Sequence, residues 1–168
     1  MTAAPVSLKP VIFAVDDDVL AFLRSRPIAM LGTRDRDNRP FAHETFLVEI
    51  EKDHIDAVVL QQFGRNLAEN VADNGVAALL VSRQPGDHRS VQLKGAITSF
   101  ESVRQGPEVY SGWSSIAPIF RAFMPEASAA AFLARVATQP AFRLRFEPSR
   151  VFDQTPGPGA GRRIGAGP

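Results

Sequence analysis

Few side chains in this sequence have the types and spacing needed to perform chemistry by themselves. There is no cysteine, which excludes thiolate nucleophiles, disulfides and cysteine-based zinc sites. The three histidines, His43, His54 and His88, have no spacing typical of a metal-binding pair on a helix. No pair of carboxylates is placed for acid–base work. The sequence therefore predicts no metal site, and it leaves the catalytic residues unknown.

Composition places the chain among ordinary globular proteins. Its 168 residues are 45% hydrophobic, which is enough for one core. Nineteen basic residues balance eighteen acidic ones, and the resulting net charge of +1 provides no field that would attract nucleic acid or a membrane surface. No apolar run has the length of a signal peptide or a membrane span. We expect a cytoplasmic protein that binds neither nucleic acid nor membranes.

Hydrophobic patterning predicts mainly strands, in meander order. The expected strands cover residues 28–33, 41–50, 55–60, 76–81, 90–100 and 142–147. In the second of these, Phe46, Val48 and Ile50 are predicted on one face, with His43 and Thr45 on the other. The run 76–81 has no polar alternation, which predicts a strand covered on both faces. Short strands in this order are typical of a small barrel.

Helices are expected at three places around these strands. Residues 16–26 have acids at the start and bases at the end, as a helix dipole favours, and residues 67–73 form a short helix closed by Asn74 and Gly75. Residues 103–138 are predicted as a helical insert of two or three helices. We expect one domain over residues 1–153, followed by a Gly/Pro-rich tail over 154–168 that is too poor in core formers to pack.

The stretch from Asp16 to Phe100 combines a leading helix, the segment Ala29–Thr33 followed by a turn and Arg39-Pro40, a strand pair, and the segments 70–77 and 89–96. With these motifs it resembles the pyridoxamine 5'-phosphate oxidase-like family of FMN-binding split β-barrels. The motifs cover about half of the chain. The resemblance implies a mainly β split barrel with appended helices, and a homodimer that builds two flavin mononucleotide (FMN) sites at its interface.

The resemblance also implies cofactor-binding residues, beginning with a phosphate-binding segment. This segment falls on Gln61, Gln62, Gly64, Arg65 and Asn66, where a strand leads into a helix. Backbone N–H groups at a helix start and a guanidinium that can bind two oxygens both suit a phosphate. Related proteins often carry a second cation beside this arginine, whereas here the neighbour is Asn66. Arg65 is the first candidate for phosphate binding.

Positions that contact the flavin ring in this family fall on Thr45, Arg89, Ser90 and Gln92. Hydrogen-bond donors near the pyrimidine edge of the ring stabilise the reduced, anionic flavin. The tryptophan and arginine that vitamin B6 oxidases carry near the C-terminus are missing, since the one tryptophan, Trp113, lies in the helical insert. Pyridoxamine phosphate is therefore not the expected substrate.

Three hypotheses for the function follow. The first is an FMN-dependent oxidoreductase that transfers hydride or electrons between a reduced nicotinamide and a small-molecule acceptor. The second changes the cofactor to a deazaflavin (F420) or to haem, with His43 or His88 as an axial ligand. The third is a non-catalytic dimer that uses the barrel to bind a ligand. The sequence does not identify the substrate or the electron donor.

Overall fold

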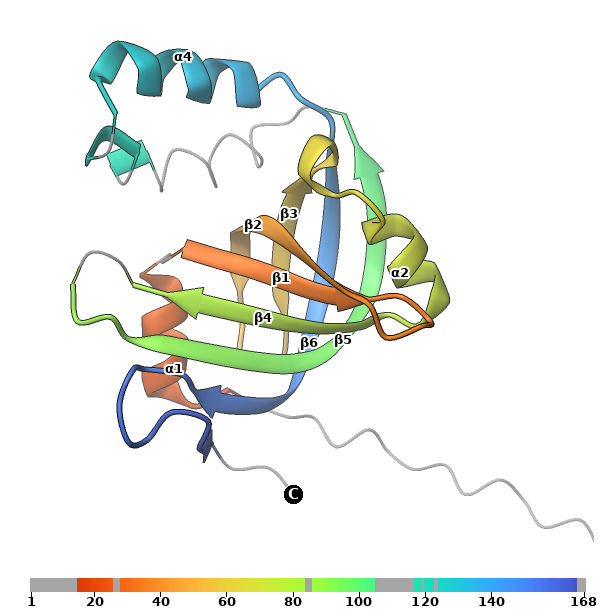
Figure 1. Cartoon of the computed structure of the whole chain (residues 1–168), viewed down its shortest axis with the longest axis vertical. Coiled ribbons are helices and arrows are strands. Elements are labelled where there is room, and N and C mark those ends of the chain that lie inside the picture. Colours follow the sequence, from red (N-terminus) through yellow and green to blue (C-terminus); the bar gives the residue numbers. More distant parts are fainter. Residues whose placement is uncertain are drawn as a thin grey trace, which may run out of the picture.

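The core of the molecule is a closed antiparallel β-barrel (Figure 1). The computed structural model describes residues 15–25, 28–83, 86–104, 117–118, 120–122 and 124–165. The strands are β1 (Ile28–Arg34), β2 (Pro40–Ile50), β3 (Ile55–Leu60), β4 (Val76–Ser82), β5 (Ser90–Val103), β6 (Ala141–Asp153) and β7 (Arg163–Ile164). Their order is β3-β2-β1-β4-β5-β6-β7, and β3 also pairs with β6, which closes the barrel. The predicted mainly β barrel with appended helices is confirmed.

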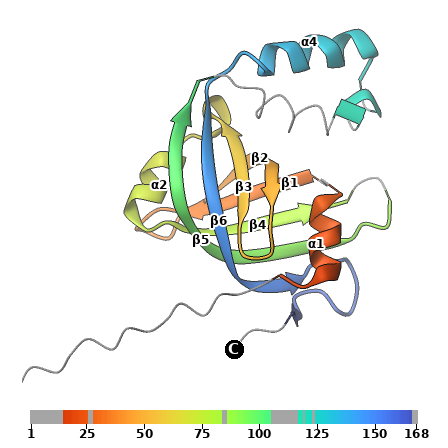
Figure 2. The same cartoon turned by 180° about the vertical axis from the view of Figure 1, so that it is seen from behind.

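Alternating side chains of the strands fill the barrel. Leu31, Val59, Leu79, Leu93 and Phe146 come from five different strands and are all buried in one cluster. The long strands β5 and β6 bend around the barrel, with register shifts at Lys94/Gly95 and Ile97/Ser99 (Figures 1 and 2). At the first shift the backbones come so close that a Cβ on Gly95 would meet the carbonyl oxygen of Glu147. The absence of a side chain at Gly95 therefore permits the bend.

The predicted faces of the second strand are partly wrong. His43 and Thr45 are buried and point into the barrel with Leu47, whereas Phe46 lies in a separate apolar cluster outside it. A β-bulge between Leu47 and Glu49 then shifts the alternation, so Ile50 points into the main core again. A bulge places two residues opposite one and thereby changes the face of everything that follows. Strict alternation could not predict this.

Helices lie around the barrel at three places (Figure 2). Helix α1 (Asp17–Arg24) begins at Asp16, whose carboxylate accepts a hydrogen bond from the backbone N–H of Val19 at 2.8 Å, as expected for an N-cap. The 3₁₀-helix η1 (Gln61–Phe63) leads into helix α2 (Leu67–Asp73), and helix α4 (Glu126–Val136) precedes β6. None of the described helices has the length and apolar character needed to cross a membrane.

The helical insert is described only in part. Strand β5 continues to Val103, and α4 is the clearest helix of the predicted insert. Phe132 and Leu133 of α4 pack against a cluster of buried residues on the outside of the barrel, made of Phe46, Val58, Leu60 and Ala141. Residues 117–118 and 120–122 are also helical, and the rest of the predicted insert before α4, with Trp113, lies outside the described residues. The insert thus covers part of the outer surface of β2 and β3.

The expectation that the C-terminal tail does not pack is wrong over its described part. Strand β7 pairs with Val151 and Phe152 of β6, and Ile164 packs against the main core. Gly157 and Gly161 turn the chain back with φ values of 143° and 84°. These backbone conformations favour glycine, so residues that look like a linker by composition form a tight return loop here.

Candidate functional site

The predicted phosphate segment is an ordered loop anchored to the barrel. The amide of Gln61 donates to the carbonyl of Pro140 at 3.0 Å, and its side chain donates to Ser102 Oγ at 2.7 Å. Gly64 is buried against the Phe142 ring, where a Cβ would lie only 3.0 Å from a ring carbon. A Cβ at position 64 would press against the Phe142 ring, so packing favours glycine there independently of any ligand.

The polar side chains of this loop face solvent. Gln62 and Arg65 are exposed, and Arg65 makes no ion pair or hydrogen bond with the part of the chain that the structure describes. Asn66 adopts the left-handed conformation, with φ 64°, and makes no side-chain cap to α2. Because α2 is only seven residues long, its dipole offers little to an anion. Among the side chains of the loop, the guanidinium of Arg65 is the one that carries a positive charge, so it is the side chain that could attract an anion.

A buried chain of hydrogen bonds supports the loop from inside the barrel. His43, only 2% exposed, lies 3.1 Å through Nδ1 from the carbonyl oxygen of Phe63 and 3.1 Å through Nε2 from Thr33 Oγ1. Thr33 Oγ1 in turn accepts a hydrogen bond from the Asn70 side chain at 2.9 Å. These contacts join β1, β2, α2 and the loop. His43 was predicted only to lie on the face of its strand opposite Phe46, and these buried contacts were not predicted from the sequence.

The environment of His43 predicts a pH-dependent stability. Burial lowers the pKa of His43 below its ordinary value of 6.5, and this outweighs the opposing effect of the Phe63 carbonyl. The unfolded chain therefore binds a proton at a higher pH than the folded chain does. Stability gained from neutral His43 is present above pH 6.5 and is lost as the pH falls towards the folded-state pKa.

Urea unfolding of the wild type and of His43→Asn checks this at about pH 7.5 and about pH 5.5. We expect the stability advantage of the wild type to shrink at the lower pH. An advantage that is equal at both values would contradict the assignment.

Thr45 is enclosed by the barrel. It is buried, and its hydroxyl donates to the carbonyl of Val58 on β3 at 3.1 Å. This hydrogen bond uses the donor that the sequence analysis assigned to a flavin ring. In the single chain, Thr45 therefore contributes to the pairing of β2 with β3.

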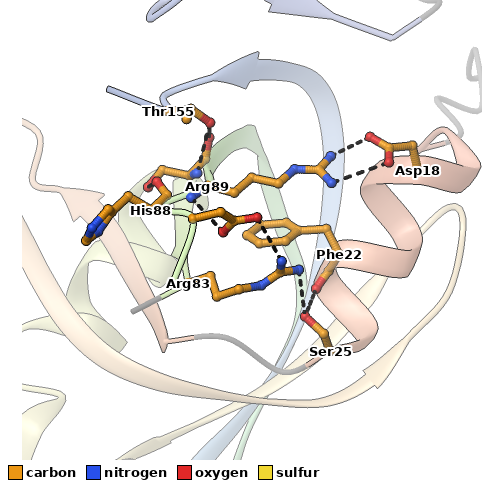
Figure 3. A network of polar contacts seen from close by, with 9 residues as sticks. Asp18, Phe22, Ser25, Arg83, His88, Arg89 and Thr155 are labelled. Atoms are coloured by element: carbon orange, nitrogen blue, oxygen red, sulfur yellow. Dashed lines mark hydrogen bonds and ion pairs between the residues drawn. The ribbon is translucent and has the colours of Figure 1, made fainter. Parts of the chain in front are cut away.

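The residues predicted around positions 89–92 lie at the opposite end of β5 from the loop. Ser102, which contacts Gln61, is near the C-terminal end of this 14-residue strand, whereas Ser90 begins it. Figure 3 shows the guanidinium of Arg89 directed at the carboxylate of Asp18 and lying over the ring of Phe22. Arg83 lies over the same ring. These contacts attach α1 to the β4–β5 connection.

Ser90 and Gln92 also have partners within the chain. The Ser90 hydroxyl lies 2.9 Å from Ser82 Oγ, and its backbone N–H donates to Thr155 Oγ1. Gln92 is half-buried and accepts a weak hydrogen bond from Gln154 at 3.4 Å. One chain thus does not bring the predicted ring-contacting residues to the predicted phosphate loop.

A cleft with a volume of ≈ 1020 Å³ lies on the outer surface of the strands. Cross-strand partners point to the same face of a sheet, and five residues in one such row line the cleft: Ala42, Gly32, Ala78, Lys94 and Arg150. The first three have little or no side chain, so the row is hollow at one end and basic at the other. Lys94 is half-buried and Arg150 is exposed, and Glu147 lines the cleft beside them. The two cations could contact an anionic group.

The neighbouring row on the same face is largely apolar. It consists of Glu44, Met30, Leu80, Gln92 and Phe152, and we call the two rows together the outer face. Leu80 is 36% exposed, and Val76, four residues earlier on the same face of β4, is 45% exposed. The prediction that 76–81 is covered on both faces is therefore wrong for the single chain.

Glu44 is the unusual member of the outer face. It is half-buried and forms no ion pair with the described residues, and burial raises the pKa of its carboxyl above the ordinary value of 4.5. Lys94 lies over the ring of Phe152 at 4.9 Å. Acid and base thus occupy opposite ends of one surface. No local pattern predicts this arrangement, because the strand order that places β2 and β5 on one face depends on contacts between distant segments.

The described residues provide no cluster of three His, Cys, Asp or Glu side chains that could hold a metal ion. His43 uses both ring nitrogens for hydrogen bonds inside the protein, so it could bind haem iron only by giving one of them up. His88 is exposed beside Arg89 on the β4–β5 connection.

No protein-family model and no curated protein matches the sequence. The fold nevertheless matches solved structures. One is a Clostridium acetobutylicum protein related to general stress protein 26 of B. subtilis, of the pyridoxinephosphate oxidase family, with a TM-score of 0.52, 11% identity, and coverage of 89% of this chain and 94% of that one. Another is Rv2991 of Mycobacterium tuberculosis, described as a conserved hypothetical protein, with a TM-score of 0.51, 13% identity, and coverage of 96% and 98%.

A candidate pyridoxamine 5'-phosphate oxidase from Lactobacillus delbrueckii is a third match, with a TM-score of 0.50, 14% identity, and coverage of 86% and 98%. At such identities the likeness concerns the fold alone. The chain has the split-barrel fold found in pyridoxamine 5'-phosphate oxidase-like proteins. The sequence resemblance and the structure therefore agree on the architecture.

Proposed function

We propose that this protein is a homodimeric oxidoreductase that binds a flavin, FMN, through the loop Gln61–Asn66. The observation that carries the proposal is Arg65: in a split barrel, an exposed guanidinium without a partner in the described chain lies on a loop that hydrogen bonds from His43 and to Ser102 anchor to the barrel. An arginine that only faces solvent does not need a loop with a fixed position. A phosphate ligand does, because two parallel hydrogen bonds require a fixed geometry.

The flavin would supply the redox chemistry, which is the transfer of hydride or electrons between a reduced nicotinamide and a small acceptor. In this proposal, Arg65 holds the phosphate, and Gln62 and Asn66 lie beside it as polar neighbours. Gln92, on the outer face, is the candidate for the pyrimidine edge of the ring, and it would come from the second copy. Arg89 and Ser90 would act indirectly, by fixing the start of β5.

The outer face favours a second copy of this chain as its partner. Leu80 and Val76 are exposed there, although their strand has the continuous apolar composition of one that is covered on both sides. A two-fold axis along the strands, between β1 and β4, would place β2 of each copy over β5 of the other. Glu44 would then approach the basic end of the face, at Lys94 and Arg150, twice per dimer.

Reversing the charge of Glu44 tests this arrangement. Glu44→Lys would place like charges together at two symmetric positions, so we expect the dimer dissociation constant to rise by about 10-fold or more. Sedimentation over a dilution series measures it. Glu69→Lys, on the exposed side of α2, is the matched control and should leave the constant unchanged. A wild-type monomer, or equal behaviour of both variants, would contradict the interface.

Two experiments test the proposed activity. The purified protein, reconstituted with FMN, should oxidise NADH or NADPH in the presence of small acceptors such as quinones or nitro compounds. Tight FMN binding without turnover in a broad screen would favour the non-catalytic alternative. Binding of a deazaflavin or haem in place of FMN would appear directly in the visible spectrum, and it would replace the cofactor in this proposal.

A further inference from the structure

We propose that His43 is a positioning residue that fixes the loop Gln61–Asn66 for its ligand through the carbonyl of Phe63. This inference rests on the proposed function, because the loop is assigned there as the phosphate-binding element. His43 does not touch the ligand in this account. It sets the orientation of the backbone that carries Arg65, two residues beyond Phe63.

The hydrogen bonds fix how protons are placed on the ring. The Phe63 carbonyl can only accept, so Nδ1 of His43 must carry the hydrogen and donate at 3.1 Å. Thr33 Oγ1 accepts from the Asn70 amide at 2.9 Å and has its own hydrogen left to donate to Nε2 at 3.1 Å. All partners are satisfied when His43 is neutral with its hydrogen on Nδ1. A direction of donation therefore runs from Asn70 through Thr33 and His43 to the loop.

The hydrogen bonds among Asn70, Thr33, His43 and Phe63 connect the loop to the barrel. Thr33 and His43 lie on the paired strands β1 and β2, which are fixed by the barrel hydrogen bonds, and both are buried. Asn70 belongs to α2, which follows the loop in the chain. The loop is therefore attached both to the interior of the barrel, through His43, and to helix α2, which follows it in the chain. Phe63 itself has an exposed side chain, at 37%, so its carbonyl is the part of the residue that is turned inward.

Two substitutions of His43 distinguish the contribution of Nδ1 from that of Nε2. In His43→Asn, the side-chain amide nitrogen takes the place of Nδ1 and can still donate to Phe63. In His43→Gln, the longer side chain brings its amide to the place of Nε2, where the amide oxygen can accept the hydrogen of the Thr33 hydroxyl, and the Phe63 carbonyl is left without its donor. Both variants lose one of two buried hydrogen bonds, so a purely structural role predicts similar losses of stability and equal ligand affinity for the two.

The measurements are FMN affinity by fluorescence titration and amide hydrogen exchange at residues 64–66 of the ligand-free protein. We expect His43→Gln to weaken FMN binding by about 10-fold and to speed exchange in the loop, whereas His43→Asn stays within about threefold of the wild type in affinity. Equal affinity and equal exchange in the two variants would overturn the inference.

The inference and the proposed function fail in different ways. If the wild type does not bind FMN, the proposed function is lost, and exchange in the ligand-free variants still decides whether His43 fixes the loop. If the variants do not fold, nitrogen NMR of the wild-type ring decides. A neutral ring with its hydrogen on Nδ1 supports the inference, and a hydrogen on Nε2 overturns it.

Discussion

Replacing Gly95 with alanine is expected to destabilise the protein by about 3 kcal/mol or more, because the barrel has no space for a side chain there. The new Cβ would lie 2.0 Å from the carbonyl oxygen of Glu147 and 2.9 Å from the Cα of Pro148. Both are backbone atoms, which cannot move aside as the end of a flexible side chain can. Relief would require β5 and β6 to separate at the bend that gives the barrel its shape.

Gly32 provides a matched control for this prediction. It also lies in a central strand, but a Cβ there would meet the carbonyl oxygen of Ala78 at 3.5 Å, an ordinary contact. Gly32→Ala should therefore change stability by less than about 1 kcal/mol. Denaturant unfolding of the two variants gives the comparison. Similar stability of Gly95→Ala and the wild type would contradict the described path of β5 and β6.

Replacing Arg65 with alanine is expected to weaken FMN binding by about 2 kcal/mol, or about 30-fold, since a charge-assisted contact to phosphate is lost. Thermal stability should not change, because the side chain is exposed and makes no ion pair or hydrogen bond with the described residues. Arg65→Lys should retain part of the affinity, as an ammonium keeps the charge but not the two-pronged geometry.

The control for Arg65 is Arg36, an exposed arginine in the turn between β1 and β2. Arg36→Ala removes the same charge from another part of the surface and should leave FMN affinity unchanged. Equal losses in both variants would indicate a general effect of net charge. An unchanged affinity in Arg65→Ala would remove this residue from the site.

Local sequence patterns predicted most of the barrel, because they depend on neighbouring residues. The capping of α1 by Asp16 and the strand composition of β3 are both visible within one turn or one strand. The bulge in β2 and the return of the tail are not, since they depend on contacts with distant strands. A register shift or a tight turn alters which face a residue occupies without changing the composition of the segment.

In the candidate site, too, contacts between residues that are distant in the sequence could not be predicted. Arg65 was proposed from sequence because the family resemblance places its phosphate-binding segment there, where a strand leads into a helix. Arg89 could not be judged in this way, since its partner Asp18 is 71 residues away in the chain. The role of His43 was hidden for a similar reason: it depends on a backbone carbonyl of Phe63, which has no signature in the sequence.

The most direct test is to titrate the purified, ligand-free protein with FMN and then remove the unbound flavin. The absorbance and fluorescence of the protein then measure how much FMN is retained. We predict retention of one FMN per chain in the wild type, and a clear loss of retention in Arg65→Ala but not in Arg36→Ala. A wild-type protein that remains colourless after reconstitution would contradict the central claim that this split barrel binds a flavin.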